Sequence, residues 1–354
     1  MTYDQIASES VELLKAMIEI PSFSREENEV ADYLEGKFSG WGLDPSRIGN
    51  NLWMRNKNWS DEKPVILLNS HIDTVRPAGG WIYDPFKATI EGERVTGLGS
   101  NDAGASVVSL LATFRYFFDD DNLPYNLLYC SSAEEEISGE NGVASILDRL
   151  GRIDLAIVGE PTQMQIAIAE KGLLVLDCEA KGRSGHAARH EGENAIYKAI
   201  NDIQILQSFQ FPFESAVLGP VKMTVTQIEA GRQHNVVPDS CRFVVDVRTN
   251  EHYSNEEAFQ IIAGLIQSEV HPRSFRLNSS GINANHPLVQ RGIAMGLPVY
   301  GSPTTSDQAV IPHPSIKMGP GDSARSHTPN EYIMIDEIKE GIATYIKLLD
   351  ALKF

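Results

Sequence analysis

Side chains that bind metal ions or transfer protons follow directly after three short apolar runs in the first half of the chain. The runs end at residues 69, 131 and 158, and the polar residues that follow them are His71 and Asp73, Glu134 to Glu136, and Glu160. In a strand, residues two apart point to the same face, so the Asp73 carboxylate could orient the His71 ring. Such a pair is typical of a metal-binding histidine, but a surface pair without a metal fits these two residues equally well.

A glycine-rich turn presents a further carboxylate. Residues 97–104 read Gly-Leu-Gly-Ser-Asn-Asp-Ala-Gly and lead into a helical segment at Ala105. No Gly-Lys-Ser/Thr follows, and the glycine spacing is not that of a dinucleotide-binding loop, so phosphate-binding motifs are excluded. What remains is a tight turn that places Asp102 before a helix, where an aspartate often serves only as an N-cap.

The three adjacent glutamates allow two interpretations. On an ordinary surface they would be a solvated turn, which is the usual meaning of a short charge run. Beside a divalent cation, one carboxylate can bind the ion while its neighbour stays free to act as a general base on water. Five side chains in such positions could together hold two ions if one carboxylate bridges them, and zinc accepts this mixture of nitrogen and oxygen ligands. They are His71, Asp102, Glu136, Glu160 and His327.

Short apolar runs alternate with helical segments around these residues. Apolar spacing predicts a helix over 6–18 that ends before Pro21, and Ser24 followed by Glu27 is typical of a capping box for the next helix. The runs and a helical segment at 105–118 favour an α/β sheet covered on both faces, which binds ligands beyond the carboxyl ends of its strands. The runs are residues 51–55, 65–69, 127–131 and 155–158.

The pattern changes at about residue 173. The expected elements are strand 173–181, helix 192–208, strands 221–229 and 241–248, helix 255–268 and strand 274–279. This βαββαβ order is that of a ferredoxin-like α+β unit. We therefore expect a discontinuous catalytic domain with a central mixed sheet, formed by residues 1–172 and 282–354, and an inserted domain at 173–281.

Seven motifs in order resemble those of the co-catalytic zinc amidohydrolases, a superfamily that includes acetylornithine deacetylase, succinyl-diaminopimelate desuccinylase, aminoacylase and carboxypeptidase G. They are Ser-His-Ile-Asp at 70–73, Gly-Gly-Trp-Ile-Tyr-Asp-Pro-Phe at 79–86, Gly-x-Gly-x-x-Asp at 97–102, Glu135-Glu136, Gly159-Glu160-Pro161, Gly185-His186-Ala187, and His327. Two positions depart from the pattern: Gly104 stands where many relatives have lysine, and the loop after Arg189 lacks the common proline. Neither position is a candidate ligand, so the departures concern the subfamily.

The resemblance implies roles for the catalytic residues. Asp102 would bridge two zinc ions, for which cobalt is a possible substitute; His71 and Glu160 would complete one site, and Glu136 and His327 the other. Asp73 would orient His71. Glu135 would be the general base, because reading Glu135-Glu136 as the motif places Gly142 six residues after the ligand, as in aminoacylase-like members. Glu134 remains the alternative base.

The resemblance also gives the inserted domain the role of a lid through which two chains form a homodimer. His186 would reach an active site, often that of the partner subunit, and donate a hydrogen bond to the tetrahedral oxyanion. Arg248 is the candidate for holding a substrate carboxylate, with Asn235 as a neutral donor. Arg248 follows Asp246 by two residues, so a purely structural ion pair is an equal possibility.

Composition excludes several classes of partner. Across 354 residues, 30 Lys and Arg stand against 48 Asp and Glu, a formal charge of −18, so nucleic acid and anionic membranes are poor partners. Cys130, Cys178 and Cys241 each lie in an apolar run, as expected for buried thiols in a reducing compartment. Residues 1–20 do not resemble a signal peptide and no apolar stretch approaches the roughly 20 residues that span a bilayer, so a cytoplasmic location is expected.

The predicted activity is hydrolysis of the amide of an Nα-acyl amino acid, with acetyl- or succinyl-ornithine or -citrulline of arginine biosynthesis as the expected substrate. Alternatives are desuccinylation of a succinyl-diaminopimelate and a dipeptidase or carboxypeptidase activity. A catalytically silent relative that binds small molecules is a further alternative of another class. Silent relatives usually lack a ligand or the base, whereas every candidate position is filled here.

Overall fold

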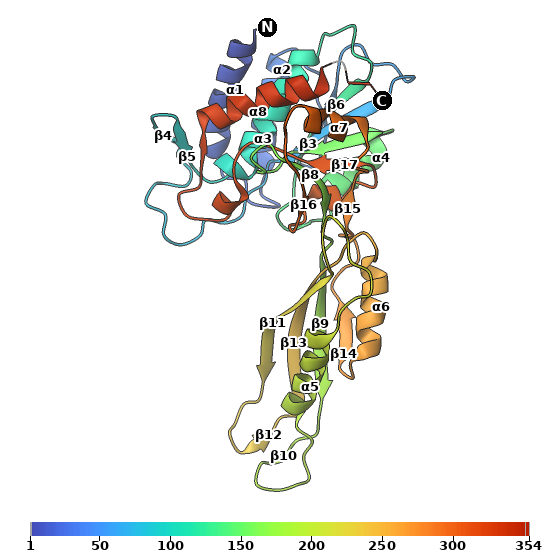
Figure 1. The fold of residues 1–354 in the computed structure, drawn as a ribbon. Helices are drawn as coiled ribbons and strands as arrows, with labels where there is room; N and C mark the ends of the chain where they lie inside the picture. Colours follow the sequence, from blue (N-terminus) through green and yellow to red (C-terminus); the bar gives the residue numbers. More distant parts are fainter. Residues whose placement is uncertain (1, 351, 354) are drawn as a thin grey trace. The chain divides into compact units, whose positions relative to one another are not determined.

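The computed structural model describes residues 2–350, 352 and 353, which form two compact units (Figure 1). The first unit comprises the chain up to Ile168, Gly281–Tyr300 and the chain from Ser306 onward. The second comprises Ala169–Ser280 with Gly301–Thr305. The second unit therefore lies within the sequence of the first.

A mixed sheet is the centre of the first unit. Its strands follow in the order β1-β2-β6-β3-β7-β17-β8. β3 is parallel to both β6 and β7, β17 is parallel to β7, and β2 is antiparallel to β6. The bounds are β1 (Ser46–Ile48), β2 (Asn51–Arg55), β3 (Val65–His71), β6 (Asn126–Ser132), β7 (Leu155–Val158), β8 (Ile166–Glu170) and β17 (Ser315–Lys317).

The central strands are buried on both faces because alternate side chains enter two different cores. Ile66 and Leu68 of β3 pack into one core, with side chains of the long helices, whereas Val65 and Leu67 pack into another with Ile146. The expected α/β sheet with a mixed strand direction is thereby confirmed. The helices of this unit are α1 (Tyr3–Ile18), α2 (Asn28–Gly40), α3 (Ala105–Phe117), α4 (Leu147–Leu150), α7 (Pro287–Ala294) and α8 (Ile335–Leu349).

Shorter elements complete the first unit. A small sheet has the order β18-β5-β4, formed by β4 (Thr89–Glu91), β5 (Arg94–Thr96) and β18 (Tyr332–Met334). The single-turn elements are η1 (Ser100–Gly104), η2 (Val143–Ile146), η3 (Asp307–Val310) and η4 (Ser323–Arg325). Strands β15 (Ser280–Gly281) and β16 (Val299–Ser302), at the points where the chain passes from one unit to the other, both pair with β8 and belong to the central sheet.

The second unit is an antiparallel sheet with two helices. Its long strands follow in the order β11-β13-β9-β14, and a two-stranded ribbon pairs β10 with β12. Leu176, Phe243 and Ile262 belong to its own buried core. The bounds are β9 (Leu174–Lys181), β10 (Gly185–His186), α5 (Ala195–Ser208), β11 (Lys222–Ala230), β12 (Val236–Val237), β13 (Ser240–Arg248), α6 (Asn255–Leu265) and β14 (Glu269–Pro272).

The last strand predicted for this unit is wrong. The strand is Glu269–Pro272, paired with β9, and residues 274–279 form a loop. Their alternation of apolar and polar residues resembles a strand, but the Leu277 carbonyl accepts hydrogen bonds from the Leu173 N–H (2.8 Å) and the Asn255 side chain (2.7 Å). Those contacts satisfy the Leu277 carbonyl without a sheet partner.

The predicted capping box at Ser24 is also wrong. Helix α2 begins at Asn28 after Glu27, and no side chain caps it. The Ser24 hydroxyl instead donates to the Asp73 carboxylate at 2.7 Å. A long-range partner has replaced the local one that the spacing indicated.

The structure also describes the burial of the cysteines and the length and hydropathy of the helices. Cys130, Cys178 and Cys241 are buried and unpaired, as expected. Among the described residues, no helix is both long and apolar enough to cross a membrane.

Candidate metal centre

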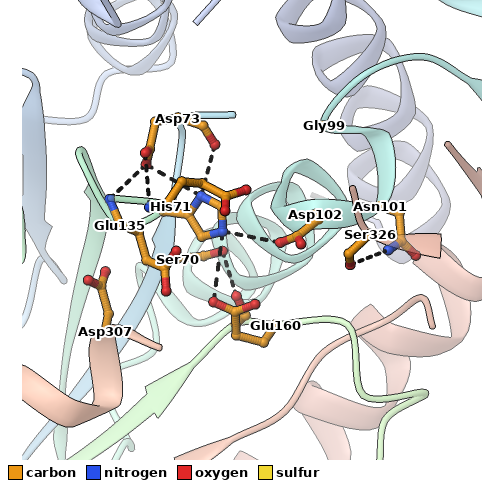
Figure 2. A network of polar contacts seen from close by, with 12 residues as sticks. Ser70, His71, Asp73, Gly99, Asn101, Asp102, Glu135, Glu160, Asp307 and Ser326 are labelled. Carbon is orange, nitrogen blue, oxygen red and sulfur yellow. Dashed lines mark hydrogen bonds and ion pairs between the residues drawn. The ribbon is translucent and has the colours of Figure 1, made fainter. Parts of the chain in front are cut away.

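The parallel strands β3, β6 and β7 bring three polar segments to one edge of the sheet (Figure 2). His71 is the last residue of β3, the glutamates at 134–136 follow β6, and Glu160 follows β7. Neighbouring parallel strands end on the same side, so their carboxyl ends deliver these side chains to one place. The turn η1, between strand β5 and helix α3, supplies Asp102.

His71 is held in one orientation. Its Nδ1 lies 2.9 Å from the Asp73 backbone oxygen and 3.5 Å from the Asp73 carboxylate. Because a carbonyl oxygen only accepts, Nδ1 carries the proton, and Nε2 faces Asp102 Oδ1 at 3.3 Å and Glu160 Oε1 at 3.8 Å. Burial lowers the pKa of His71, but the hydrogen bonds to Asp102 and Asp73 outweigh it and raise the pKa well above its usual value.

The two oxygens of Asp102 face two different histidines. Oδ1 lies 3.3 Å from His71 Nε2, and Oδ2 lies 3.6 Å from Nε2 of His327. His327 Nε2 is also 2.9 Å from Glu136 Oε2. Asp102 thus stands between a His71–Glu160 pair and a His327–Glu136 pair, which is the arrangement that a carboxylate shared by two ions requires.

Two groups of donor atoms are close enough to hold an ion. One consists of His71, Asp102 and Glu136, the other of His71, Glu135 and Glu160, and within each group all ligand atoms lie within 4.8 Å of one another. All five candidate ligands and the candidate base are therefore brought into one cluster. The prediction of their proximity from strand ends and motif order agrees with the geometry.

The protein itself does not supply enough positive charge to balance the carboxylates of this cluster. Burial, with repulsion from Asp102, raises the pKa of Glu160 to about 8, and burial likewise raises the pKa values of Glu135 and Glu136. The hydrogen bond to Glu136 raises the pKa of His327 to about 9. Glu160 Oε1 is buried without a hydrogen-bond partner among the described residues. An orphaned carboxylate oxygen beside further carboxylates and two imidazoles fits a site for divalent cations.

Asp73 also fixes the glutamate segment. Its Oδ1 accepts the N–H of Glu135 at 3.0 Å and its Oδ2 the N–H of Glu136 at 3.1 Å. Glu134 turns into its own loop, where its oxygens accept the Asn141 side chain (2.9 Å) and the Asn141 N–H (3.2 Å). Of the two candidate bases, only Glu135 lies in a group of metal-binding donors.

Three partners of this cluster, of which Asp307 and Glu331 are buried, were not predicted from the sequence. Besides Ser24, Asp307 of η3 accepts the Asn69 side chain (2.8 Å) and the Ser132 hydroxyl (2.6 Å), so it joins the ends of β3 and β6. Burial raises the pKa of Asp307 to about 6. Glu331 accepts backbone N–H groups of the loop that carries Asp102. The Pro-Asn-Glu segment after His327 is the one local signal in the sequence for any of the three.

The remaining candidates belong to the second unit. His186 pairs with Val236 in the β10–β12 ribbon, and the Ala187 N–H donates to the Asn235 carbonyl at 3.0 Å, so His186 and Asn235 are neighbours. Both side chains are exposed. Arg248 forms a two-pronged ion pair with Asp246, at 2.8 and 3.1 Å, as the spacing indicated.

A mixed α/β sheet with a buried imidazole and carboxylates at the ends of its strands, completed by Asp102 and the exposed His327 from loops, is the arrangement of a metal-dependent hydrolase. Residues 67–351 match Peptidase family M20/M25/M40, and the chain belongs to this family. It is 27% identical over 278 residues to the succinyl-diaminopimelate desuccinylase of Dinoroseobacter shibae, a match that covers 73% of this chain and 72% of that enzyme.

A second relative covers nearly the whole chain. It is the LysW-lysine/LysW-ornithine hydrolase of Sulfurisphaera tokodaii, 29% identical over 357 residues, which are 96% of this chain and 95% of the relative. Among solved structures, a dinuclear metal binding peptidase of the M20 family from Bacillus subtilis superposes with a TM-score of 0.73 at 16% identity, over 98% of each chain. At that identity the superposition shows a shared fold.

Proposed function

We propose that this protein hydrolyses the amide bond of an Nα-acyl amino acid with two zinc ions. The observation that carries the proposal is the position of Asp102, whose two oxygens face a His–Glu pair on either side. The Bacillus subtilis relative is a dinuclear metal binding peptidase, which supports a pair of ions here. The nitrogen and oxygen donors suit zinc, and cobalt would be accepted by the same set.

The proposed ligands divide between the two ions. Asp102 would bridge them, His71 and Glu160 would complete one set, and Glu136 and His327 would complete the other. When bound, the ions would polarise the scissile carbonyl and lower the pKa of the attacking water. All five side chains are held by elements of the first unit.

Glu135 is the proposed general base. It would take the proton of the attacking water and deliver it to the leaving amine, so the same carboxylate serves both halves of the reaction. Asp73 would keep the ring of His71 oriented and, through two backbone N–H groups, keep Glu135 and Glu136 in register. The hydroxyl of Ser24 would hold Asp73 in turn.

The second unit is proposed to act as a lid and dimerisation domain. Strand β11 stands at the end of its sheet, and Ile228 on it is 56% exposed. Helix α5 exposes Tyr197, Ile200 and Ile205. An open strand edge with apolar side chains beside it favours a homodimer, in which His186 would donate to the oxyanion in the partner's site. Arg248, with Asn235, would bind the substrate carboxylate.

The substrate is proposed to be acetyl- or succinyl-ornithine or the corresponding citrulline derivative. The name of the Sulfurisphaera relative includes ornithine, which supports an amino acid of that length. Succinyl-diaminopimelate is the second candidate, because the Dinoroseobacter relative is a desuccinylase for it. A silent binding protein is disfavoured, since the base and every proposed ligand are present.

A substrate panel tests the proposal. The purified protein, loaded with two equivalents of zinc, is assayed for amine release from acetyl- and succinyl-ornithine, the two citrulline derivatives, succinyl-diaminopimelate and a set of dipeptides. We expect turnover that disappears with a chelator and returns with zinc. Absence of hydrolysis of every acyl amino acid, with hydrolysis of dipeptides instead, would refute the proposed substrate class while leaving the metal centre intact.

A further inference from the structure

Glu331 connects the two loops that carry Asp102 and His327. Its side chain is only 2% exposed, and its carboxylate accepts three backbone N–H groups. Oε1 accepts those of Asn101 (2.8 Å) and Asp102 (2.9 Å), and Oε2 accepts that of Gly99 (3.2 Å). Glu331 therefore binds the backbone N–H of Asp102, the residue whose carboxylate faces both histidines.

Strand pairing sets Glu331 in this place. Tyr332 of β18 pairs with Thr96 of β5, and the Gly97 N–H donates to the Glu331 carbonyl at 3.0 Å. The residue after β5 and the residue before β18 are thus side by side. From there the Glu331 side chain reaches the turn at 99–102. Glu331 itself comes four residues after His327 in the chain.

Asn101 makes a second connection between the same loops. Its Nδ2 donates to the Asp322 carbonyl (3.1 Å) and to the hydroxyl of Ser326 (3.3 Å), the neighbour of His327, and its Oδ1 accepts the Asp322 N–H (3.0 Å). Figure 2 shows Asn101 and Ser326 beside Asp102. Gly321 permits this approach: its φ is +89°, and a Cβ there would lie 2.3 Å from Asn101 Oδ1.

The acceptor at position 331 is costly to bury. Burial and then repulsion from the nearby carboxylate of Asp102 raise the pKa of Glu331, and no Lys or Arg forms an ion pair with it among the described residues. A neutral side chain would cost less to bury. The three N–H groups, however, converge on both ends of the side chain, so both terminal atoms must accept hydrogen bonds. A carboxylate has two accepting oxygens, whereas an amide has one oxygen and one donating nitrogen. The glutamate at position 331 therefore fixes the backbone geometry of the turn at 99–102.

We propose that Glu331 is a positioning residue of the metal centre, which acts by holding the backbone of Asp102 so that its two oxygens face the two proposed ion sites at once. The inference rests on the proposed function, because it takes Asp102 as the bridging ligand. Glu331 itself binds neither ion. Its loss should therefore weaken both ions together.

The test compares metal affinity in three variants of the full-length protein. In Glu331→Gln, the amide nitrogen faces an N–H donor of the turn, so at least one hydrogen bond is lost. We expect affinity for both zinc ions, measured by chelator competition, to fall about 10- to 100-fold, the usual effect of losing a partner that orients a ligand. The visible spectrum of the cobalt-loaded variant should change as well. Glu331→Asp, which keeps the charge but reaches fewer N–H groups, should move the affinity in the same direction and serves if the glutamine variant does not fold.

Asp202→Asn is the matched control. Asp202 is also a buried carboxylate, and it accepts the N–H groups of Gln267 (3.1 Å) and Ser268 (2.8 Å), but it lies in the second unit, which contains none of the proposed ligands. The control should lower the melting temperature and leave metal affinity and the cobalt spectrum unchanged. Wild-type affinity for both ions in the Glu331 variants would overturn the inference. A wild-type protein that binds no pair of ions would instead refute the proposed function.

Discussion

Replacing Glu135 by glutamine separates proton transfer from metal binding. The Glu135 side chain lies in one donor group with His71 and Glu160, yet the segment is held through its backbone by Asp73. Glutamine has the same shape and leaves that backbone hydrogen bond in place. The variant should therefore keep its fold and its metal content and lose the ability to accept a proton.

The expected size of the effect follows from the role. Loss of a general base lowers kcat by about 10² to 10⁴, which corresponds to about 3 to 5 kcal/mol in the activation barrier. KM should change little, because Glu135 contributes to the transition state rather than to substrate binding. Steady-state kinetics with the best substrate of the panel measure the loss, and metal analysis of the same sample measures the zinc content.

Glu134→Gln is the matched control one residue away. Both Glu134 oxygens are engaged by Asn141, so an amide there loses one hydrogen bond and should cost about 1 to 3 kcal/mol of stability. Its kcat should stay near that of the wild type. If Glu134→Gln is inactive while Glu135→Gln turns over normally, the assignment of the base is off by one residue. If Glu135→Gln has lost its zinc, Glu135 is a ligand and the proposed division of roles is wrong.

Three further predictions concern the ligands, the substrate and pH. Asp102→Ala should lower the occupancy of both ions in metal analysis; undiminished binding of two ions with full activity would contradict a bridging role. Arg248→Ala should reduce kcat/KM for acyl amino acids by about 2 to 4 kcal/mol and matter much less for a carboxamide analogue, whereas equal loss on both would mean that its ion pair with Asp246 is structural. In the metal-free protein, the pKa values of Glu160, about 8, and His327, about 9, lie above those of the unfolded chain, so the folded state holds protons that the unfolded state releases. Its melting temperature should therefore fall as pH rises from about 5 to 9, and bound zinc should abolish the decline; a metal-free protein that gains stability over this range would contradict the assignment.

Buried strands of the first unit were predictable because burial leaves a pattern. The runs at 51–55 and 155–158 coincide with β2 and β7, and the run at 65–69 falls two residues short of the end of β3. Each is apolar along most of its length, since strands covered on both faces cannot alternate. The three-residue strands β4, β5 and β18 carry no such pattern, because their pairing depends on contacts between distant segments rather than on local periodicity.

The candidate site likewise contains residues that the sequence could place together and residues that it could not. His71 and Glu160 could be placed together because both lie at the carboxyl ends of parallel strands, and these ends meet at one edge of the sheet. The partners that fix the geometry lie beyond that rule. Ser24 is 49 residues from Asp73 and Glu331 is 229 residues from Asp102, and no spacing in the sequence connects either pair.

Partners of this kind are hidden because each looks like something local. Ser24 has the spacing of a helix cap, and Glu331 follows a Pro-Asn turn, where a charged residue is expected to face water. Folding buries the carboxylate of Asp73, to which Ser24 donates, and the carboxylate of Glu331 itself. A buried carboxylate needs hydrogen-bond donors, and these can come from any segment that the fold brings close. The ligands of such a centre are therefore readable from residue type and strand position. The rigidity that keeps Asp102 between two histidines depends on hydrogen bonds that only the folded chain brings together.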